Sequence, residues 1–399
     1  MPRPSDARLL VLLCLSETLS MSGFAVWPAL LPQLQDAWQL SGTAAGMVGG
    51  AYFAGYMLAV PWLSGLTDRI DARRVYSFAC LLGAASFLGF ALLASDSLSA
   101  SLFQLGAGAG LAGTYMPGLK ALNDRLATPA RPRYIAIYTS TFGIGASLSY
   151  AAAGWIGSHL GWQTAFMLAA LGPLAACCLL LTTLAPVRPH GAGQRVRLGS
   201  MFLVLADRAT LGYVLGYAVH CWELFGLRSW IVALLAYSAL ASASALPLAP
   251  ASAAALINLI GIPASILGNE IAGRIGRRSF ILMTMTASGL LAWATGAVVA
   301  WPWALLTILM LYNVAIMADS AALTSGLIAS AEPTRLGAAL AVYSLIGFGA
   351  GFLGPLIFGA ALDLAGGRGE PGAWLIACGS LGLGCLLAPW AHRLWQRSP

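Results

Sequence analysis

Residues 209–237 read "ATLGYVLGYAVHCWELFGLRSWIVALLAY", a long apolar run that contains His220, Glu223 and Arg228 near its middle. A helix needs about 20 mostly apolar residues to cross the hydrocarbon core of a bilayer. The stretch therefore predicts a membrane-spanning helix. Its three polar residues are costly at that depth, and they mark a candidate functional site.

The composition of the whole chain agrees with this reading. Of its 399 residues, 59% are hydrophobic and 9% are charged, whereas soluble domains carry about 25% charged residues. We therefore expect an all-α integral membrane protein. The seven cysteines lie in apolar stretches without zinc-site or disulfide spacing. They are interpreted as small buried residues, and no metal or cofactor is expected.

The first 20 residues, "MPRPSDARLLVLLCLSETLS", are similar in character to a secretory signal peptide. Glu17 interrupts the apolar run, which then continues through Trp27 to Leu31. This length favours a retained membrane-spanning helix over a cleaved leader.

Eleven further segments are long and apolar enough to span a bilayer, so we expect twelve spanning helices. The approximate limits are 9–33, 43–66, 75–94, 99–122, 134–158, 162–184, 209–237, 251–273, 279–300, 303–328, 338–362 and 373–391. The polar connection at 185–208 divides them into an N-terminal six-helix bundle, residues 1–184, and a C-terminal six-helix bundle, residues 209–399.

The distribution of Lys and Arg predicts the orientation. If both termini are cytoplasmic, every one of the 21 Lys and Arg falls on cytoplasmic segments except Arg228 and Arg368. This positive-inside bias predicts cytoplasmic termini and a location in the cell membrane. The net charge of +7 is then a topology signal, and nucleic acid is not an expected partner.

Two pairs of segments indicate an internal repeat. "ETLSMSGFAVWPALL" (17–31) aligns with "HCWELFGLRSWIVALL" (220–235) when Trp27 is placed on Trp230, and "DRIDARR" (68–74) aligns with "GRIGRR" (273–278) at nearly the same offset. Duplicated halves with a binding site near the membrane midplane are common in secondary transporters. We therefore predict two pseudosymmetric bundles.

With "SGLTDRIDARR" (64–74) in the loop after the second helix, the chain resembles the major facilitator superfamily over essentially its whole length. The resemblance implies that a cytoplasmic gating motif ties the second helix to the start of the eleventh, at 331–340. In this sequence the gating motif comprises Asp68, Arg69, Arg73, Arg74, Arg274, Arg277 and Arg278. Ser64, Asp71 and Ala72 depart from the family pattern in the first copy of the motif, and Gly273 departs from it in the second. The Gly-Pro motif of drug/proton antiporters is absent from the fifth helix, and a Gly-Pro pair lies at 354–355 instead.

Five ionisable residues are expected deep in the membrane: Glu17, His220, Glu223, Arg228 and Asp319. A carboxylic acid in a dry site can load and release a proton as water access changes sides, and an imidazole can share that role. Arg228 either neutralises one of the acids or grips an anionic solute. Trp27, Tyr56 and Trp230 are candidate aromatic residues of the cavity.

These features predict a secondary active transporter that moves a small organic solute by alternating access with proton coupling. Three acids against one arginine favour a cationic or neutral, drug-like solute. The alternative is proton-coupled uptake of an organic anion gripped by Arg228, and a membrane sensor or intramembrane enzyme is a remote third. No Walker-type phosphate loop occurs in the sequence, so ATP is not the expected direct energy source, and without a nucleophile motif no enzyme is expected. We expect the carrier to be a monomer.

Overall fold

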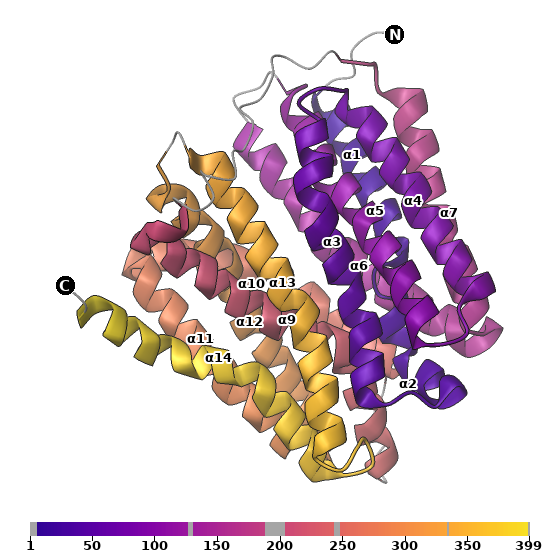
Figure 1. Cartoon of the computed structure of the whole chain (residues 1–399), viewed down its shortest axis with the longest axis vertical. Coiled ribbons are helices and arrows are strands. Elements are labelled where there is room, and N and C mark those ends of the chain that lie inside the picture. The colour runs from indigo at the N-terminus through magenta and orange to yellow at the C-terminus, as the bar shows by residue number, and fades with distance from the viewer. Residues whose placement is uncertain (1–5, 127–130, 188–203, 243–247, 333–334, 398–399) are drawn as a thin grey trace. The chain divides into compact units, whose positions relative to one another are not determined.

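The computed structural model describes residues 6–126, 131–187, 204–242, 248–332 and 335–397. Long helices dominate these ranges, which contain no strand. The helices are α1 (Asp6–Ser20), η1 (Met21–Gly23), α2 (Val26–Trp38), α3 (Gly42–Leu66), α4 (Ala72–Leu93), α5 (Ser97–Asn123), α6 (Arg131–Leu160), α7 (Trp162–Thr183), α9 (Arg208–Ala241), α10 (Pro250–Ile275), α11 (Arg277–Ala297), α12 (Pro302–Ser330), α13 (Leu336–Leu364) and α14 (Pro371–Arg397). Figure 1 shows how they follow one another along the chain.

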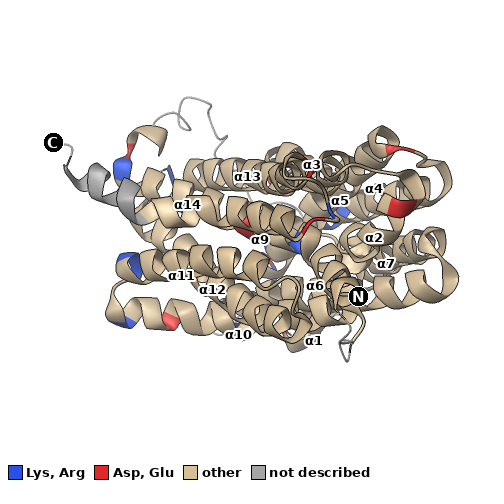
Figure 2. Ribbon diagram, turned by 90° about the horizontal axis from the view of Figure 1, so that it is seen from below, with Lys and Arg blue, Asp and Glu red and all other residues tan. Residues whose placement is uncertain are grey.

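Ten of these segments are long and apolar enough to cross a membrane, the segment Asp6–Trp38 counting as one. Two more long helices, α5 and α6, are not among them; they are rich in Gly, Ser, Thr and Tyr. Charged residues lie mostly near helix ends and in connections, and long stretches of helix contain none (Figure 2). The described chain is thus a multi-pass membrane protein with ten candidate spans, where the sequence predicted twelve.

The first predicted helix is interrupted. Its continuity ends at Ser20, and the short η1 joins α1 to α2. Ser149 donates to the carbonyl of Ser22 at 2.7 Å and accepts from the amide of Ala25 at 2.9 Å, while the Ser22 hydroxyl donates to the carbonyl of Ala169 at 2.6 Å. Side chains that take over backbone hydrogen bonds are a recognised cause of a helix break.

Acidic residues in the connections cap the helices that follow them. Asp71, Asp96 and Asp207 accept hydrogen bonds from the first-turn amides of α4, α5 and α9. A carboxylate at this position satisfies unpaired amides and interacts favourably with the helix dipole. Hydrogen bonds from Ser99 lower the pKa of Asp96; the bond from its hydroxyl has the larger effect and the bond from its backbone amide the smaller one.

The chain forms two compact units. Unit 1 comprises Met1–Leu30 and Ala51–Arg195, and unit 2 comprises Leu31–Gly50 and Val196–Pro399. Both α2 and α3 therefore have residues in each unit. The predicted connection at 185–208 falls largely on residues 188–203, which lie outside the described residues.

Close backbone packing holds unit 1 together. Its helix α4 packs against α5 and α7, and α3 meets α5 through glycines. A Cβ added at Gly108 would lie 1.7 Å from the Tyr52 carbonyl oxygen, and one added at Gly55 would lie 1.9 Å from that of Leu105. Small residues permit such approach where lipid supplies no hydrophobic drive for helix association.

In unit 2, α9 packs against α13 and α12, α11 against α14, and α10 against α12. A glycine also allows close backbone packing between α10 and α12: a Cβ added at Gly268 would lie 2.1 Å from the Ala318 carbonyl oxygen. Buried apolar clusters fill the space between the helices, one of them around Met285 and Leu323.

Gly108→Ala is predicted to lower the free energy of unfolding by about 1–3 kcal/mol, because the new methyl group overlaps the α3 backbone. Gly65→Ala is the matched control in α3, since a Cβ there meets nothing within 4 Å. Thermal denaturation of both variants in one detergent measures the difference. Equal melting temperatures for the two variants would contradict the packing described here.

Candidate functional site

Glu17 lies on α1 inside unit 1 and is 0% exposed. Its Oε2 is 3.3 Å from the hydroxyl of Tyr76 on α4 and 3.3 Å from the hydroxyl of Tyr138 on α6. Its Oε1 has no hydrogen-bond partner among the described residues. Among those residues, the partners of this carboxyl group are hydroxyls, not cations.

The Tyr138 hydroxyl has one proton and two possible acceptors. It donates to the carbonyl oxygen of Tyr115 at 3.0 Å, a shorter contact than the 3.3 Å to Glu17. When that proton points to Tyr115, the phenolic oxygen can accept a hydrogen bond from the protonated carboxyl group of Glu17. The geometry therefore accommodates a protonated Glu17 as donor to Tyr138. The rings of Tyr115 and Tyr138 stack at 6.0 Å and hold both groups in place.

Glu223 lies on α9 inside unit 2 and is 2% exposed. Its Oε2 accepts from the Ser288 hydroxyl of α11 at 2.9 Å and from the Cys385 thiol of α14 at 3.1 Å. The Tyr312 hydroxyl also faces this carboxyl group. Neither that hydroxyl nor Oε1 of Glu223 has a hydrogen bond of good geometry among the described residues.

His220 and Asp319 form a buried pair between α9 and α12. Nδ1 of His220 lies 2.8 Å from Oδ1 of Asp319, and the two residues are 2% and 3% exposed. Beside them the rings of Tyr217 and Tyr343 stack at 3.8 Å. One proton shared between the imidazole and the carboxyl group satisfies this contact in either direction. Although His220 and Glu223 are one turn apart, they have different partners.

Arg228 is also buried in unit 2, with 5% of its surface exposed. Its Nη2 lies 3.9 Å from the thioether sulfur of Met317 on α12. The three predicted polar residues of α9 therefore contact three different sets of neighbours. Glu223 reaches α11 and α14, His220 reaches the acid on α12, and Arg228 reaches a methionine on α12.

The three candidate cavity aromatics are each 1% exposed. Trp27 packs edge-on against Phe90 at 6.0 Å. The Trp230 indole donates to the carbonyl of Pro355 at 3.0 Å, and its ring stacks on Phe358. Trp27 and Trp230 are thus packed against neighbouring helices. Tyr56 is likewise buried, in unit 1.

The gating-motif residues lie at helix ends. Asp68 lies 3.9 Å from Lys120 of α5. Arg73 donates to the carbonyl of Leu184 at 2.7 Å, and Arg277 is half-buried. The remaining four are exposed, namely Arg69, Arg74, Arg274 and Arg278. The helix start at 331–340 includes residues 333–334, which lie outside the described residues.

Asp71, which sequence reasoning treated only as a departure from the motif, organises this end of unit 1. Besides capping α4, its carboxylate lies 3.4 Å from Nη2 of Arg125 and accepts from the amide of Val187 at 2.9 Å. Arg125 also donates to the carbonyl of Ala185 at 3.1 Å. The N-cap position of Asp71 was the available sequence signal, but its partners are far away in the chain.

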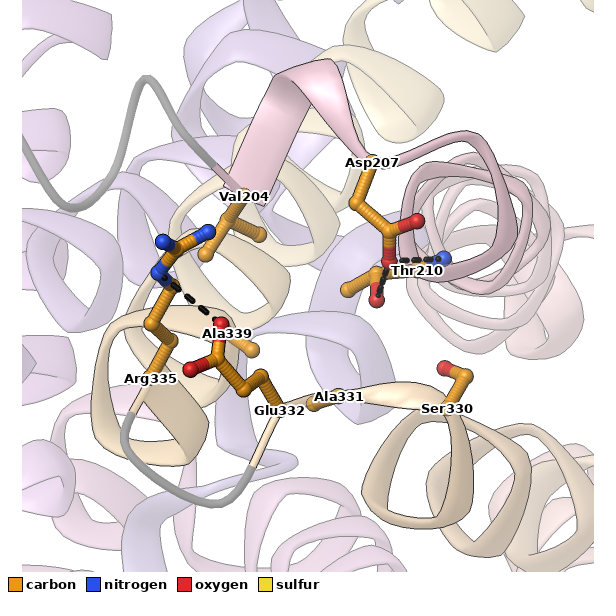
Figure 3. Close-up of a pocket in the computed structure, with 8 residues that line it drawn as sticks. All are labelled: Val204, Asp207, Thr210, Ser330, Ala331, Glu332, Arg335 and Ala339. Carbon is orange, nitrogen blue, oxygen red and sulfur yellow. Dashed lines mark hydrogen bonds and ion pairs between the residues drawn. The ribbon is translucent and has the colours of Figure 1, made fainter.

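Unit 2 also has a cavity of about 350 Å³, lined by α9, α12 and α13 together with Val204 and Asp207. Figure 3 shows Asp207 bound to Thr210, and Arg335 paired with Glu332 at 3.2 Å. The Thr210 hydroxyl lowers the pKa of Asp207. Each charged group is thus satisfied by a neighbour, and none of the five membrane residues lines this cavity.

Sequence reasoning missed most partners of the buried acids. Tyr76, Tyr138 and Ser288 carried no local signal, and Cys385 was interpreted as an apolar filler although its thiol donates to Glu223. In the part of the chain that the structure describes, no group of three or more His, Cys, Asp or Glu side chains is placed to hold a metal ion.

Comparison with solved structures gives the same fold. A bacterial homologue of the human lysosomal transporter Spinster, in inward-facing and unoccupied conformation, matches with a TM-score of 0.79 at 17% identity, covering 100% of this chain and 98% of that one. The inward-facing and occupied conformation matches with a TM-score of 0.77 at 17% identity and the same coverage. At this identity the likeness concerns the fold alone.

A curated relative matches part of the sequence. The 3-(3-hydroxy-phenyl)propionate transporter of Escherichia coli (strain K12) is 29% identical over 213 residues, which is 51% of this chain and 49% of that protein. The match thus spans about half the length of the relative.

The family model of the Major Facilitator Superfamily matches residues 12–355. Members of this superfamily are membrane transporters, not enzymes. With most of its length matched and the same fold, this chain belongs to the Major Facilitator Superfamily.

Proposed function

We propose that the protein is a proton-coupled secondary carrier that moves a small organic acid across the cell membrane by alternating access. In this proposal α5 and α6 also span the bilayer, giving two six-helix halves, 1–184 and 209–399, with both termini in the cytoplasm. The connection at 185–208 joins the halves. The carrier works as a monomer in lipid, and its partners are the solute and protons.

The buried carboxyl groups support proton coupling. An ionised carboxylate away from water costs several kcal/mol unless a cation pairs with it. The partners of Glu17 and Glu223 are hydroxyls and a thiol. Such a group is stable in the dry site with a proton bound, and it can release that proton when water reaches it.

The nature of the acids' partners carries the assignment of the solute. The sequence alone has three acids and one arginine at membrane depth, and this excess of acids favours a cationic or neutral solute. In the structure Asp319 is paired with His220, and Glu17 and Glu223 have uncharged partners. Arg228 is a buried cationic group on α9, and its guanidinium lies against the sulfur of Met317 on α12.

The relative from Escherichia coli adds support, because its name describes an aromatic carboxylic acid as its solute. A guanidinium binds a carboxylate with two parallel hydrogen bonds. The sulfur of Met317 beside it could contact an aromatic ring favourably. We therefore prefer the organic-acid reading, with Arg228 as the residue that binds the carboxylate.

Arg228→Ala is expected to lower uptake of 3-(3-hydroxyphenyl)propionate into proteoliposomes at least tenfold, because the carboxylate loses its cationic partner. Arg228→Lys keeps the positive charge but loses the planar guanidinium that makes two parallel hydrogen bonds, so it is expected to retain part of the uptake. Melting temperatures of both variants check that they remain folded. If Arg228→Ala transports the acid at the unaltered rate, the solute assignment is wrong.

Glu17→Gln and Glu223→Gln each replace a proton-binding group with a permanently neutral one. We expect at least one of them to abolish accumulation driven by an inward proton gradient while solute exchange without a gradient persists. Ser288→Ala is the control, since it removes a donor to Glu223 but no carboxyl group. The coupling role fails if both glutamine variants still accumulate solute as a function of the gradient.

A further inference from the structure

Helix α10 contains a buried amide side chain whose oxygen is unused. Asn258 is 2% exposed, and its Nδ2 donates to the carbonyl oxygen of Ala254, one turn earlier, at 2.9 Å. Its Oδ1 has no hydrogen-bond partner among the described residues. The bond from Nδ2 fixes which end of the amide is the oxygen, because an oxygen in that place would face another acceptor. A buried acceptor without a partner is costly and calls for an explanation.

Asn258 lies beside the part of α12 that contains Met317. Less than one turn further along α10, a Cβ added at Gly261 would lie 2.8 Å from Cγ of Met317 and 2.9 Å from Nδ2 of Asn313. Asn313 also donates to the carbonyl oxygen of Ile257, the residue before Asn258, at 2.6 Å. These contacts hold the amide of Asn258 next to the α10–α12 interface, at the level of Asn313 and Met317.

Met317 connects this region to the guanidinium of Arg228. Its Sδ lies 3.9 Å from Nη2 of Arg228 on α9, while its Cγ faces Gly261 on α10. All of these residues belong to unit 2, in which α12 packs against both α9 and α10. The order across the three helices is therefore a cationic group, a thioether and then an amide with an unpaired acceptor.

This order matches the groups of a hydroxylated aromatic acid. A guanidinium binds a carboxylate, a thioether contacts an aromatic ring favourably, and an amide oxygen accepts from a phenolic hydroxyl. Met317 fills the middle position in the described conformation, and its unbranched, flexible side chain can move aside for a ring. A solute without the hydroxyl would leave Oδ1 of Asn258 buried and unpaired.

We propose that Asn258 is a specificity-determining residue that accepts a hydrogen bond from a hydroxyl on the ring of the solute. The carrier then selects hydroxylated aromatic acids over unsubstituted ones. This assignment rests on the proposed function, because it needs Arg228 to bind the carboxylate at the other end of the solute. Sites built to hydrogen-bond a hydroxyl discriminate strongly against analogues that lack it, since the buried group then stays without a partner.

The test compares uptake of two acids by the whole chain in proteoliposomes. One is 3-(3-hydroxyphenyl)propionate, and the other is 3-phenylpropionate, which differs only in lacking the ring hydroxyl. We expect the parent protein to transport the hydroxylated acid with a kcat/KM at least tenfold higher. Asn258→Ala removes the acceptor without filling its place, so the ratio of the two kcat/KM values is expected to fall to near unity while uptake of 3-phenylpropionate persists.

Two further variants separate recognition of the hydroxyl from a loss of structure. Asn258→Ser retains a smaller acceptor and is expected to keep part of the preference. Asn269→Ala is the matched control, because Asn269 is also on α10 and its Oδ1 also has no partner among the described residues. It lies about 16 Å further along the helix at a rise of 1.5 Å per residue, so we expect it to keep the parent ratio. Melting temperatures show whether each variant is folded.

The outcomes distinguish this assignment from the proposed function. Equal uptake of the two acids by the parent protein leaves the proposed function standing and overturns the role of Asn258. The same holds if a folded Asn258→Ala variant keeps the parent ratio, including the case in which it loses both acids to the same extent. Uptake of neither acid by the parent protein removes the proposed function, and the role of Asn258 falls with it.

Discussion

The free energy of a charge held away from water governs where the ionisable side chains of this protein lie. Most charged residues are at helix ends and in connections (Figure 2), where they cap helices or pair with neighbours as Asp71 does with Arg125. The few buried ones have specific partners. Because an unpaired charge at the bilayer centre costs roughly 2.5–3.5 kcal/mol on insertion scales, each buried acid is best explained by a role that needs it.

The two units satisfy their buried acids in different ways. Unit 1 surrounds Glu17 with phenolic hydroxyls, whereas unit 2 gives Glu223 a hydroxyl and a thiol and gives Asp319 an imidazole. In both units the partners of the buried acids are compatible with the proton coupling proposed above.

The sequence predicted much of the fold, because the length of an apolar run and the period of its polar residues are local properties. It also singled out the five residues that the structure finds buried. It could not predict the break at Ser20, which depends on Ser149 and Ala169 from distant helices. For the same reason it missed Tyr76 and Tyr138, which lie 59 and 121 residues from Glu17 along the chain.

A count of residue types says little about the solute's charge for a related reason. A count of acids treats each carboxyl group as available to bind a cationic solute. In the packed structure Asp319 already contacts His220, and Glu223 already accepts a hydrogen bond from Ser288. Three-dimensional neighbours, not residue types, decide what each group can do.

Simultaneous recording of solute and proton movement in proteoliposomes tests the central claim most directly. With the membrane potential clamped, the protein should take up an aromatic carboxylic acid together with protons, so that the external medium becomes more alkaline as uptake proceeds. Uptake of the acid with no accompanying proton movement, or proton release coupled to uptake of an organic cation, would contradict the account.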